Sequence, residues 1–174
     1  MVVKSIFILL VILFLVGCSD KDGFKNEIEN NNLEHLLHQN DSIEIYADIT
    51  INHFRQEKDI IKKHDNKLVI TSYFKTNEDS EKWTFIGSVD YHFNDKDSLN
   101  FQNLFIRLNE KDTVIYNDRP PTFTVVYKED SSKYYSHGLY DIIENSMYYL
   151  WIKQRIFPND SFYIDLIKRD RIKF

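Results

Sequence analysis

The sequence predicts an α+β fold, in which an antiparallel β-meander of six to seven strands packs one apolar face against a C-terminal amphipathic helix. Three observations lead to this class. Hydrophobic and polar residues alternate in several short segments, as in strands that bury one face. Short polar turns join these segments, and connections of this length leave no room for parallel crossovers. Near the C-terminus, over 133–157, the hydrophobic period lengthens to that of a helix.

The folded part is expected to begin with a helix over 27–39, followed by a strand over 42–52. Apolar residues at helical spacing support the helix. The run Asn30-Asn31-Asn32 opposes it, because asparagine side chains compete for backbone hydrogen bonds. In the strand, polar residues occupy one face, and the other face holds Ile43, Ile45, Ala47, Ile49 and Ile51.

Further strands are expected over 67–75 and 82–93, around 104–108, and over 113–116 and 122–128. Around 104–108 the leucines and isoleucine alternate but Phe101 is out of phase, which predicts a bulge near Gln102 and Asn103. Segment 161–174 also alternates and predicts a last strand. The strand order stays open, as does the choice between a sheet that wraps around the helix and a half-barrel.

The helix over 133–157 is apolar on two sides, and Pro158 ends it. One side is a core stripe that holds Leu139, Ile143, Met147 and Leu150. The other side holds Tyr148, Trp151 and Arg155, which are residue types that dominate binding interfaces. A helix with two apolar sides needs two neighbours, and the sheet is only one. These three residues are therefore the predicted partner-binding surface, and the alternative is that the N-terminal segment or a loop covers this side.

The first eighteen residues predict export from the cytoplasm. Lys4 precedes an unbroken apolar run over 6–16, which ends at Gly17 and Cys18, the single cysteine of the chain. A basic start, a short apolar core and a small residue before a cleavage point form the pattern of a secretory signal peptide. The apolar run has about half of the ~20 residues that a transmembrane helix needs.

The residues Leu15-Val16-Gly17-Cys18 resemble the lipobox of bacterial lipoproteins. In that family the chain is cut before the cysteine, whose sulfur then carries fatty chains such as palmitate. The resemblance implies a signal peptide over 1–17, a lipidated Cys18 with a tether over 18–26, and a single α+β domain over 27–174. The alternatives are plain secretion with a free thiol and an anchor that is never cleaved.

The resemblance also implies a location outside the cytoplasm, on the cell membrane or the outer membrane, with the bilayer as the first partner. Ser19 resembles the outer-membrane sorting choice of enteric lipoproteins. Cleavage would leave 21 basic and 27 acidic residues, a formal charge of −6. This charge disfavours nucleic acid, whose phosphate backbone calls for clustered Lys and Arg.

Side chains that could carry chemistry form four weak constellations. His35 and His38 would share a helix face, but no third zinc ligand is evident. Asp95-Lys96-Asp97, with Asn100, resembles a calcium loop but lacks its turn glycine and bidentate glutamate. Ser72-Tyr73-Phe74-Lys75 has the Ser-x-x-Lys spacing of penicillin-binding proteins without their partner motifs. No motif predicts a metal or a cofactor.

The fourth constellation is Asp90 and His92, on the polar face of one predicted strand. If the strand that carries Glu44 and Asp48 were its neighbour, a carboxylate could orient His92 as a general base. Ordinary polar contacts between strands would explain the same residues.

Together these observations predict a lipid-anchored, non-enzymatic envelope protein that binds a protein partner or an apolar ligand. One alternative is an envelope hydrolase that acts on polysaccharide or peptide with Asp90 and His92. The other is a lipid carrier that uses the sheet as a cup. A deep pocket that joins His92 to a carboxylate would favour the hydrolase, and a large dry cavity between helix and sheet would favour the carrier.

Overall fold

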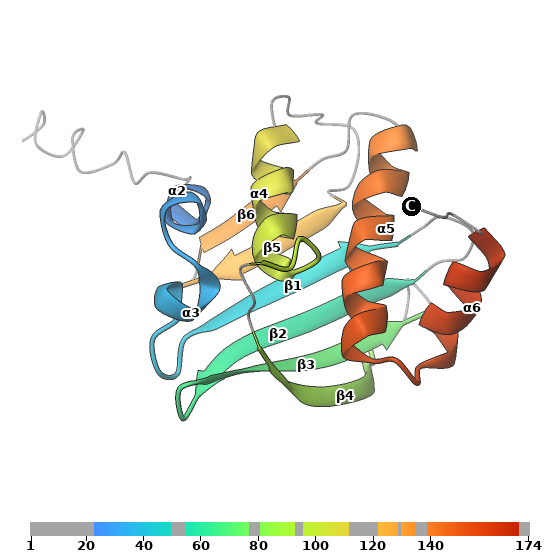
Figure 1. The fold of residues 1–174 in the computed structure, drawn as a ribbon, viewed down its shortest axis with the longest axis horizontal. Coiled ribbons are helices and arrows are strands. Elements are labelled where there is room, and N and C mark those ends of the chain that lie inside the picture. The colour runs from blue at the N-terminus through green and yellow to red at the C-terminus, as the bar shows by residue number, and fades with distance from the viewer. Residues whose placement is uncertain are drawn as a thin grey trace, which may run out of the picture.

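The computed structural model describes residues 23–49, 55–76, 81–92, 96–111, 122–128, 130–134 and 139–170. These residues form one six-stranded antiparallel sheet and five helices, and the helices lie over one face of the sheet (Figure 1). The predicted α+β class, with its antiparallel strands and C-terminal helix, is confirmed.

The strands are β1 Ser42–Asp48, β2 Gln56–His64, β3 Lys67–Lys75, β4 Thr84–Tyr91, β5 Phe123–Tyr127 and β6 Asp130–Tyr134. They lie in the order β4-β3-β2-β1-β5-β6, so that β4 and β6 form the two edges. The first four strands are a meander, and β5 joins the other side of β1. Ile45 of β1 therefore faces Asp59 of β2 on one side and Val125 of β5 on the other.

The helices are α2 Gly23–Asn30, α3 Leu33–Leu36, α4 Phe101–Lys111, α5 Leu139–Ile156 and α6 Ser161–Asp170. The single helix predicted over 27–39 is thus two helices, which separate at the asparagine run. Asn32 caps α3, because its side chain accepts a hydrogen bond from the His35 amide at 3.0 Å. α2 begins at Gly23, inside the segment expected to be the tether.

The strand predicted around 104–108, with its bulge, is wrong, because this segment is helix α4. Its apolar residues lie at helical spacing, and the structure buries Phe101, Leu104, Phe105 and Leu108 almost completely. Phe101 is out of phase only when the segment is read as a strand. As a helix it stacks on Phe105, with ring centroids 6.4 Å apart, and meets Tyr149 of α5 edge-on at 6.3 Å.

The strand predicted over 161–174 is also wrong for the residues that the structure describes, which form helix α6. Asp160 starts this helix, since its carboxylate accepts from the Phe162 amide at 2.9 Å. Phe162 and Tyr163 are successive residues, and both pack against the hydrophobic core. Successive residues can do so on a helix that is packed on two sides. Three apolar residues in alternation are too few to separate the two periods.

Strand β6 was not predicted, and it ends at Tyr134, inside the helix predicted over 133–157. Strand β2 was not predicted either. Its inward-facing residues are Glu57, Asp59 and Ile61, all with 0% exposure. Two carboxylates on the buried face remove the hydrophobic alternation by which a strand is recognised. The strand predicted over 113–116, like the whole signal and lipobox segment, lies outside the described residues.

A close approach positions the C-terminal end of α5 over the β4 edge. A β-carbon added at Gly87 of β4 would lie 2.9 Å from the ring of Phe157, the residue after α5. Only glycine lets the ring come this near to the strand backbone. The register between β3 and β4 also shifts at this point, at Ser72 and Tyr73. The last turns of α5 thereby come to lie above the second half of β4.

Candidate functional site

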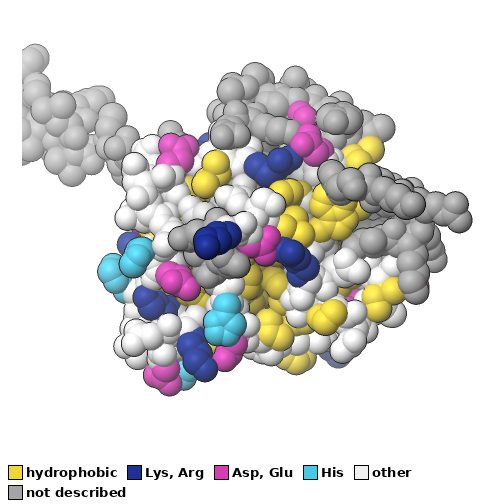
Figure 2. Space-filling model, in the orientation of Figure 1, with side chains coloured by type: hydrophobic (Ala, Val, Ile, Leu, Met, Phe, Trp, Pro, Cys, Tyr) yellow, Lys and Arg dark blue, Asp and Glu magenta, His cyan; other side chains and the backbone are white. Residues whose placement is uncertain are grey.

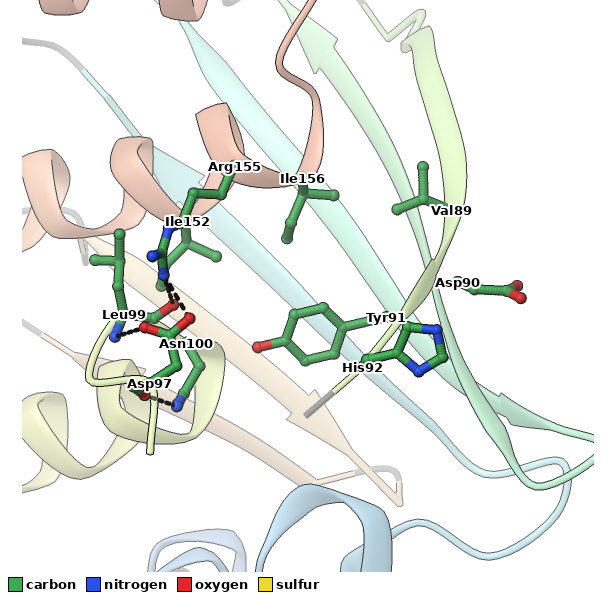
Figure 3. Close-up of a pocket in the computed structure, with 10 residues that line it drawn as sticks. All are labelled: Val89, Asp90, Tyr91, His92, Asp97, Leu99, Asn100, Ile152, Arg155 and Ile156. Atoms are coloured by element: carbon green, nitrogen blue, oxygen red, sulfur yellow. Dashed lines mark hydrogen bonds and ion pairs between the residues drawn. The ribbon is translucent and has the colours of Figure 1, made fainter. Parts of the chain in front are cut away.

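A pocket of about 250 Å³ opens between the second half of β4, the start of α4 and the last turns of α5 (Figure 3). We call it the β4 pocket. Its apolar wall consists of Val89, Leu99, Ile152 and Ile156. The polar side chains around it belong to His92, Asp97, Asn100 and Arg155, and the ring of Tyr91 projects towards its floor. Apolar walls with a few convergent polar groups are typical of binding sites.

Arg155 is held at the rim of the β4 pocket by one of its two terminal nitrogens. Its Nη1 lies 2.5 Å from Asp97 Oδ2 and 3.5 Å from the Leu99 carbonyl oxygen. The hydrogen bond from Arg155, together with that from the Leu99 amide, lowers the pKa of Asp97 below its usual value. Within the described residues, Nη2 and Nε of Arg155 make no hydrogen bond, so an ordered guanidinium keeps donors for a bound group.

The floor of the β4 pocket is the capped start of α4. Asn100 accepts from the Asn103 amide at 2.8 Å and donates to the Asp97 carbonyl oxygen at 2.5 Å. The Phe101 amide donates to the Tyr91 hydroxyl at 3.2 Å. Burial raises the pKa of Tyr91 to about 12, so its phenol stays neutral even at an alkaline pH at which an exposed tyrosine ionises. The polar groups here are fixed in place before anything binds.

Of the three residues predicted to bind a partner, only Arg155 lines the β4 pocket. The Tyr148 hydroxyl donates to the Ser98 carbonyl oxygen, and the Arg107 guanidinium lies 4.8 Å from its ring. Trp151 is half-buried and packs against the core. The segment before α4 and α4 itself thus cover much of the side of α5 that was predicted to bind a partner. Hydrophobic side chains nevertheless remain visible among charged ones on the helical face of the protein (Figure 2). A partner-binding role for all three residues stays a prediction.

The structure does not assemble the predicted pair of a carboxylate with His92. β1, which carries Glu44 and Asp48, is separated from β4 by two strands. Glu44 instead lies 2.9 Å from Lys58 Nζ and accepts from Tyr46. Asp90 points away from the β4 pocket and accepts from Lys67 at 3.2 Å (Figure 3).

The other constellations also find ordinary roles. His35 and His38 are both exposed, and the described residues contain no group of three or more potential metal ligands. Asp97, from the calcium-like segment, pairs with Arg155. Ser72, from the Ser-x-x-Lys segment, is fully buried on β3. There it contacts a set of buried charged side chains that the sequence analysis did not predict.

That group is a buried ionic cluster between the sheet and the two C-terminal helices. Its charged members are Glu57 and Asp59 of β2, Lys153 of α5, and Arg55, which directly precedes β2. Lys153, Glu57 and Asp59 have side chains with 0% exposure, and Arg55 has 5%. Two cations face two anions, so the cluster is neutral overall.

Hydrogen bonds satisfy nearly every polar atom of the buried ionic cluster. Lys153 Nζ donates to Asp59 Oδ1 and, at 2.6 Å, to Ser72 Oγ. The Tyr149 hydroxyl lies 2.6 Å from Asp59 Oδ2, and the Tyr163 hydroxyl donates to Glu57 Oε2 at 2.8 Å. Burial, followed by the neighbouring carboxylates, raises the pKa of both tyrosines far above its usual value.

Arg55 closes the cluster from the side of α6. Its Nε donates to Glu57 Oε1 at 2.8 Å, and its guanidinium lies 4.2 Å from the ring of Phe74 and 3.6 Å from that of Phe162. Its Nη2 has no hydrogen-bond partner within the described residues, and the two ring faces take the place of one. A cluster so closed to solvent is suited to orienting helices and offers no substrate a path to Ser72.

We expect Lys153→Met to lower the free energy of unfolding by about 3–5 kcal/mol, because it leaves the buried Asp59 without a cation and leaves Glu57 with Arg55 alone. The matched control is Lys67→Met, which removes an ion pair of similar length in which both side chains are more than half exposed. The control should cost no more than about 1 kcal/mol. Urea denaturation measures both, and equal losses would contradict the role given to Lys153.

The pair of Arg155 and Asp97 should be visible in the pH dependence of Asp97. Its pKa is lowered in the folded state, so the pair stabilises the protein above the usual aspartate pKa and stops doing so as the pH falls through the folded value. Arg155→Gln should raise the Asp97 pKa, measured from carboxyl carbon chemical shifts, whereas Lys133→Gln at a distant exposed site should not. An unchanged Asp97 titration in Arg155→Gln would show that the contact is absent in solution.

Comparison with known proteins identifies no relative: no family model, no curated protein and no solved structure matches this chain. Among the described residues, none of the helices has the length and apolar character to cross a bilayer. The function must therefore be inferred from the residues of this chain alone.

Proposed function

We propose that this protein is a lipid-anchored lipoprotein of the bacterial cell envelope and acts there as a non-enzymatic binding module. The observation that carries the binding role is the β4 pocket, with its apolar wall and its fixed Arg155 at the rim. The lipobox at Leu15–Cys18 supports the anchor. Two or three fatty chains on one cysteine would hold the protein firmly, since each buried methylene contributes about 0.8 kcal/mol.

The arrangement of the sheet supports an accessible pocket in the anchored protein. The described chain begins at Gly23 in α2, which packs against α4 and β6. The β4 pocket is lined by residues of β4. β4 forms the opposite edge of the sheet (Figure 1). Five strand spacings separate the two edges, which is about 24 Å at ~4.8 Å per spacing. A bilayer close to α2 would leave the β4 edge directed away from its surface.

The size of the pocket favours a protein partner over a free ligand. Sites for drug-sized molecules occupy roughly 300–1,000 Å³, and the β4 pocket is slightly smaller, at about 250 Å³. A cavity of this size suits one large side chain of a partner, with Arg155 beside it for a hydrogen bond. Tight interfaces typically depend on a few such anchors in pockets.

The two alternative functions have less support. The hydrolase needs a carboxylate that orients His92, and Glu44, Asp48 and Asp90 are all engaged or placed elsewhere. The lipid carrier needs a large cavity between helix and sheet. In the described residues that space is filled by rings such as Phe101 and Tyr149 and by the buried ionic cluster.

The anchor is tested by Cys18→Ser. This change should abolish metabolic labelling with palmitate and move the protein from the membrane fraction to the soluble fraction, because no other residue of the lipobox can carry a thioether. Gly17→Ala, which keeps a small residue before the cysteine, is the control and should keep both properties. Labelling that persists in Cys18→Ser would contradict the lipoprotein assignment.

The binding role is tested in living cells with a photocrosslinking amino acid at position 92. His92 is exposed and lines the β4 pocket, and His35 is exposed on α3 and does not line the pocket, so it offers a matched control position. We expect a discrete crosslinked adduct from position 92, resolved by electrophoresis and mass spectrometry, and none from position 35. Equal adducts from both positions, or no adduct from position 92, would contradict binding at this site.

A further inference from the structure

We infer that the partner at this site is an extended peptide segment that adds to the free edge of β4 as a further strand and places one apolar side chain in the β4 pocket. The inference rests on the proposed binding function and names the class of its partner. It is carried by the backbone of β4 and by the position of the pocket beside it.

β4 has one neighbour in the sheet. It pairs with β3 along one side, and within the described residues no strand pairs with the other side. The opposite edge, β6, is a shorter strand of five residues, and α2 packs against it. A helix therefore packs against the β6 edge of the sheet. The β4 edge instead presents backbone donors and acceptors that a further strand could use.

The β4 edge has one of the usual protections against pairing, the register shift opposite Ser72 and Tyr73, but it lacks charge and proline. The segment Thr84-Phe85-Ile86-Gly87-Ser88-Val89 contains no charge and no proline, the features by which natural edge strands prevent association. Phe85 is 58% exposed, and among the described residues no other large hydrophobic side chain is as open to solvent. An apolar edge strand without charge or proline is typical of surfaces that receive a strand from a partner.

The side chain of Ser88 indicates which backbone groups face outward. Its hydroxyl lies 3.0 Å from that of Thr71, the residue directly opposite on β3. Side chains come closest in antiparallel pairs that do not exchange backbone hydrogen bonds. The contact therefore indicates that the N–H and C=O groups of Ser88 point towards the open edge of β4. By alternation Asp90 is directed the same way, while Gly87 and Val89 bond to β3.

The same alternation connects the edge to the pocket. Val89 and Tyr91 pair with the buried Ile70 and Leu68, so they lie on the inner face of the sheet and line the β4 pocket. Residues of an added strand that face Val89 and Tyr91 would also point inward, towards Ile156. The expected partner is thus a strand-forming segment with an apolar residue at one inward position.

The test begins with random linear peptides displayed on phage and panned against the full-length protein in detergent. An enriched peptide is then synthesised in two forms that carry N-methyl groups on alternate residues, in opposite phase. Since only every second amide of an added strand donates to the edge, one form should bind at least tenfold more weakly than the other. Equal affinity of the two forms, or enrichment of no peptide, would overturn the inference.

A protein variant provides the second measurement. Ser88→Pro removes the outward amide while sparing the ladder with β3, and we expect at least a tenfold loss of peptide affinity. Ser88→Ala keeps the amide and should bind as the wild type does. If circular dichroism shows that Ser88→Pro does not fold, the affinities of the two N-methylated peptides for the wild-type protein decide the question. Full affinity in a folded Ser88→Pro would overturn strand addition.

Failure of the inference is distinguishable from failure of the proposed function. An adduct from position 92 together with equal affinity of the two N-methylated forms would keep the binding role and reject strand addition. Absence of that adduct rejects the binding role itself. Amide hydrogen exchange of the free protein adds a direct check, because a Ser88 amide as protected as that of Val89 would show that the edge is already covered.

Discussion

The contact of Lys153 with Asp59 and Ser72 sets the orientation on which the rest of the structure depends. Helix α5 is apolar around much of its circumference, so burial alone would allow it to dock on the sheet in several rotations. A buried ammonium must meet its carboxylate, and this requirement selects one rotation. That rotation directs Ile152, Ile156 and Arg155 to the β4 pocket.

The remaining charged groups fall into two classes with different consequences. In the buried ionic cluster, Glu57 and Asp59 are paired, hydrogen-bonded and closed to solvent, which makes them part of the core. At the pocket rim, Asp97 holds Arg155 in a solvent-accessible place and leaves some of its donors free for a partner. The first arrangement gives the fold its specificity, and the second gives the proposed site its polarity.

The sheet is asymmetric in a way that agrees with a tethered binding module. Helix α2, where the described chain begins, packs against the β6 edge. The β4 edge is open and carries no charged residue over Thr84–Val89. Gly87 lets Phe157 approach the β4 backbone, so the end of α5 comes to lie above this open edge and forms one wall of the pocket. The start of the described chain, the open edge and the pocket are thus distributed along one direction of the sheet.

The sequence alone determined the α+β class, the strands with regular alternation such as β1, and the lipobox resemblance, because these depend on local pattern. It could not reveal β2, since Glu57 and Asp59 look like surface residues until Arg55 and Lys153, which is 94 residues away from Asp59, neutralise them. It assigned α4 and α6 to strands because a few apolar residues fit both periods. Only the tertiary structure decided that Arg155 joins the β4 pocket, because β4, α4 and α5 meet there through contacts that are distant in the chain.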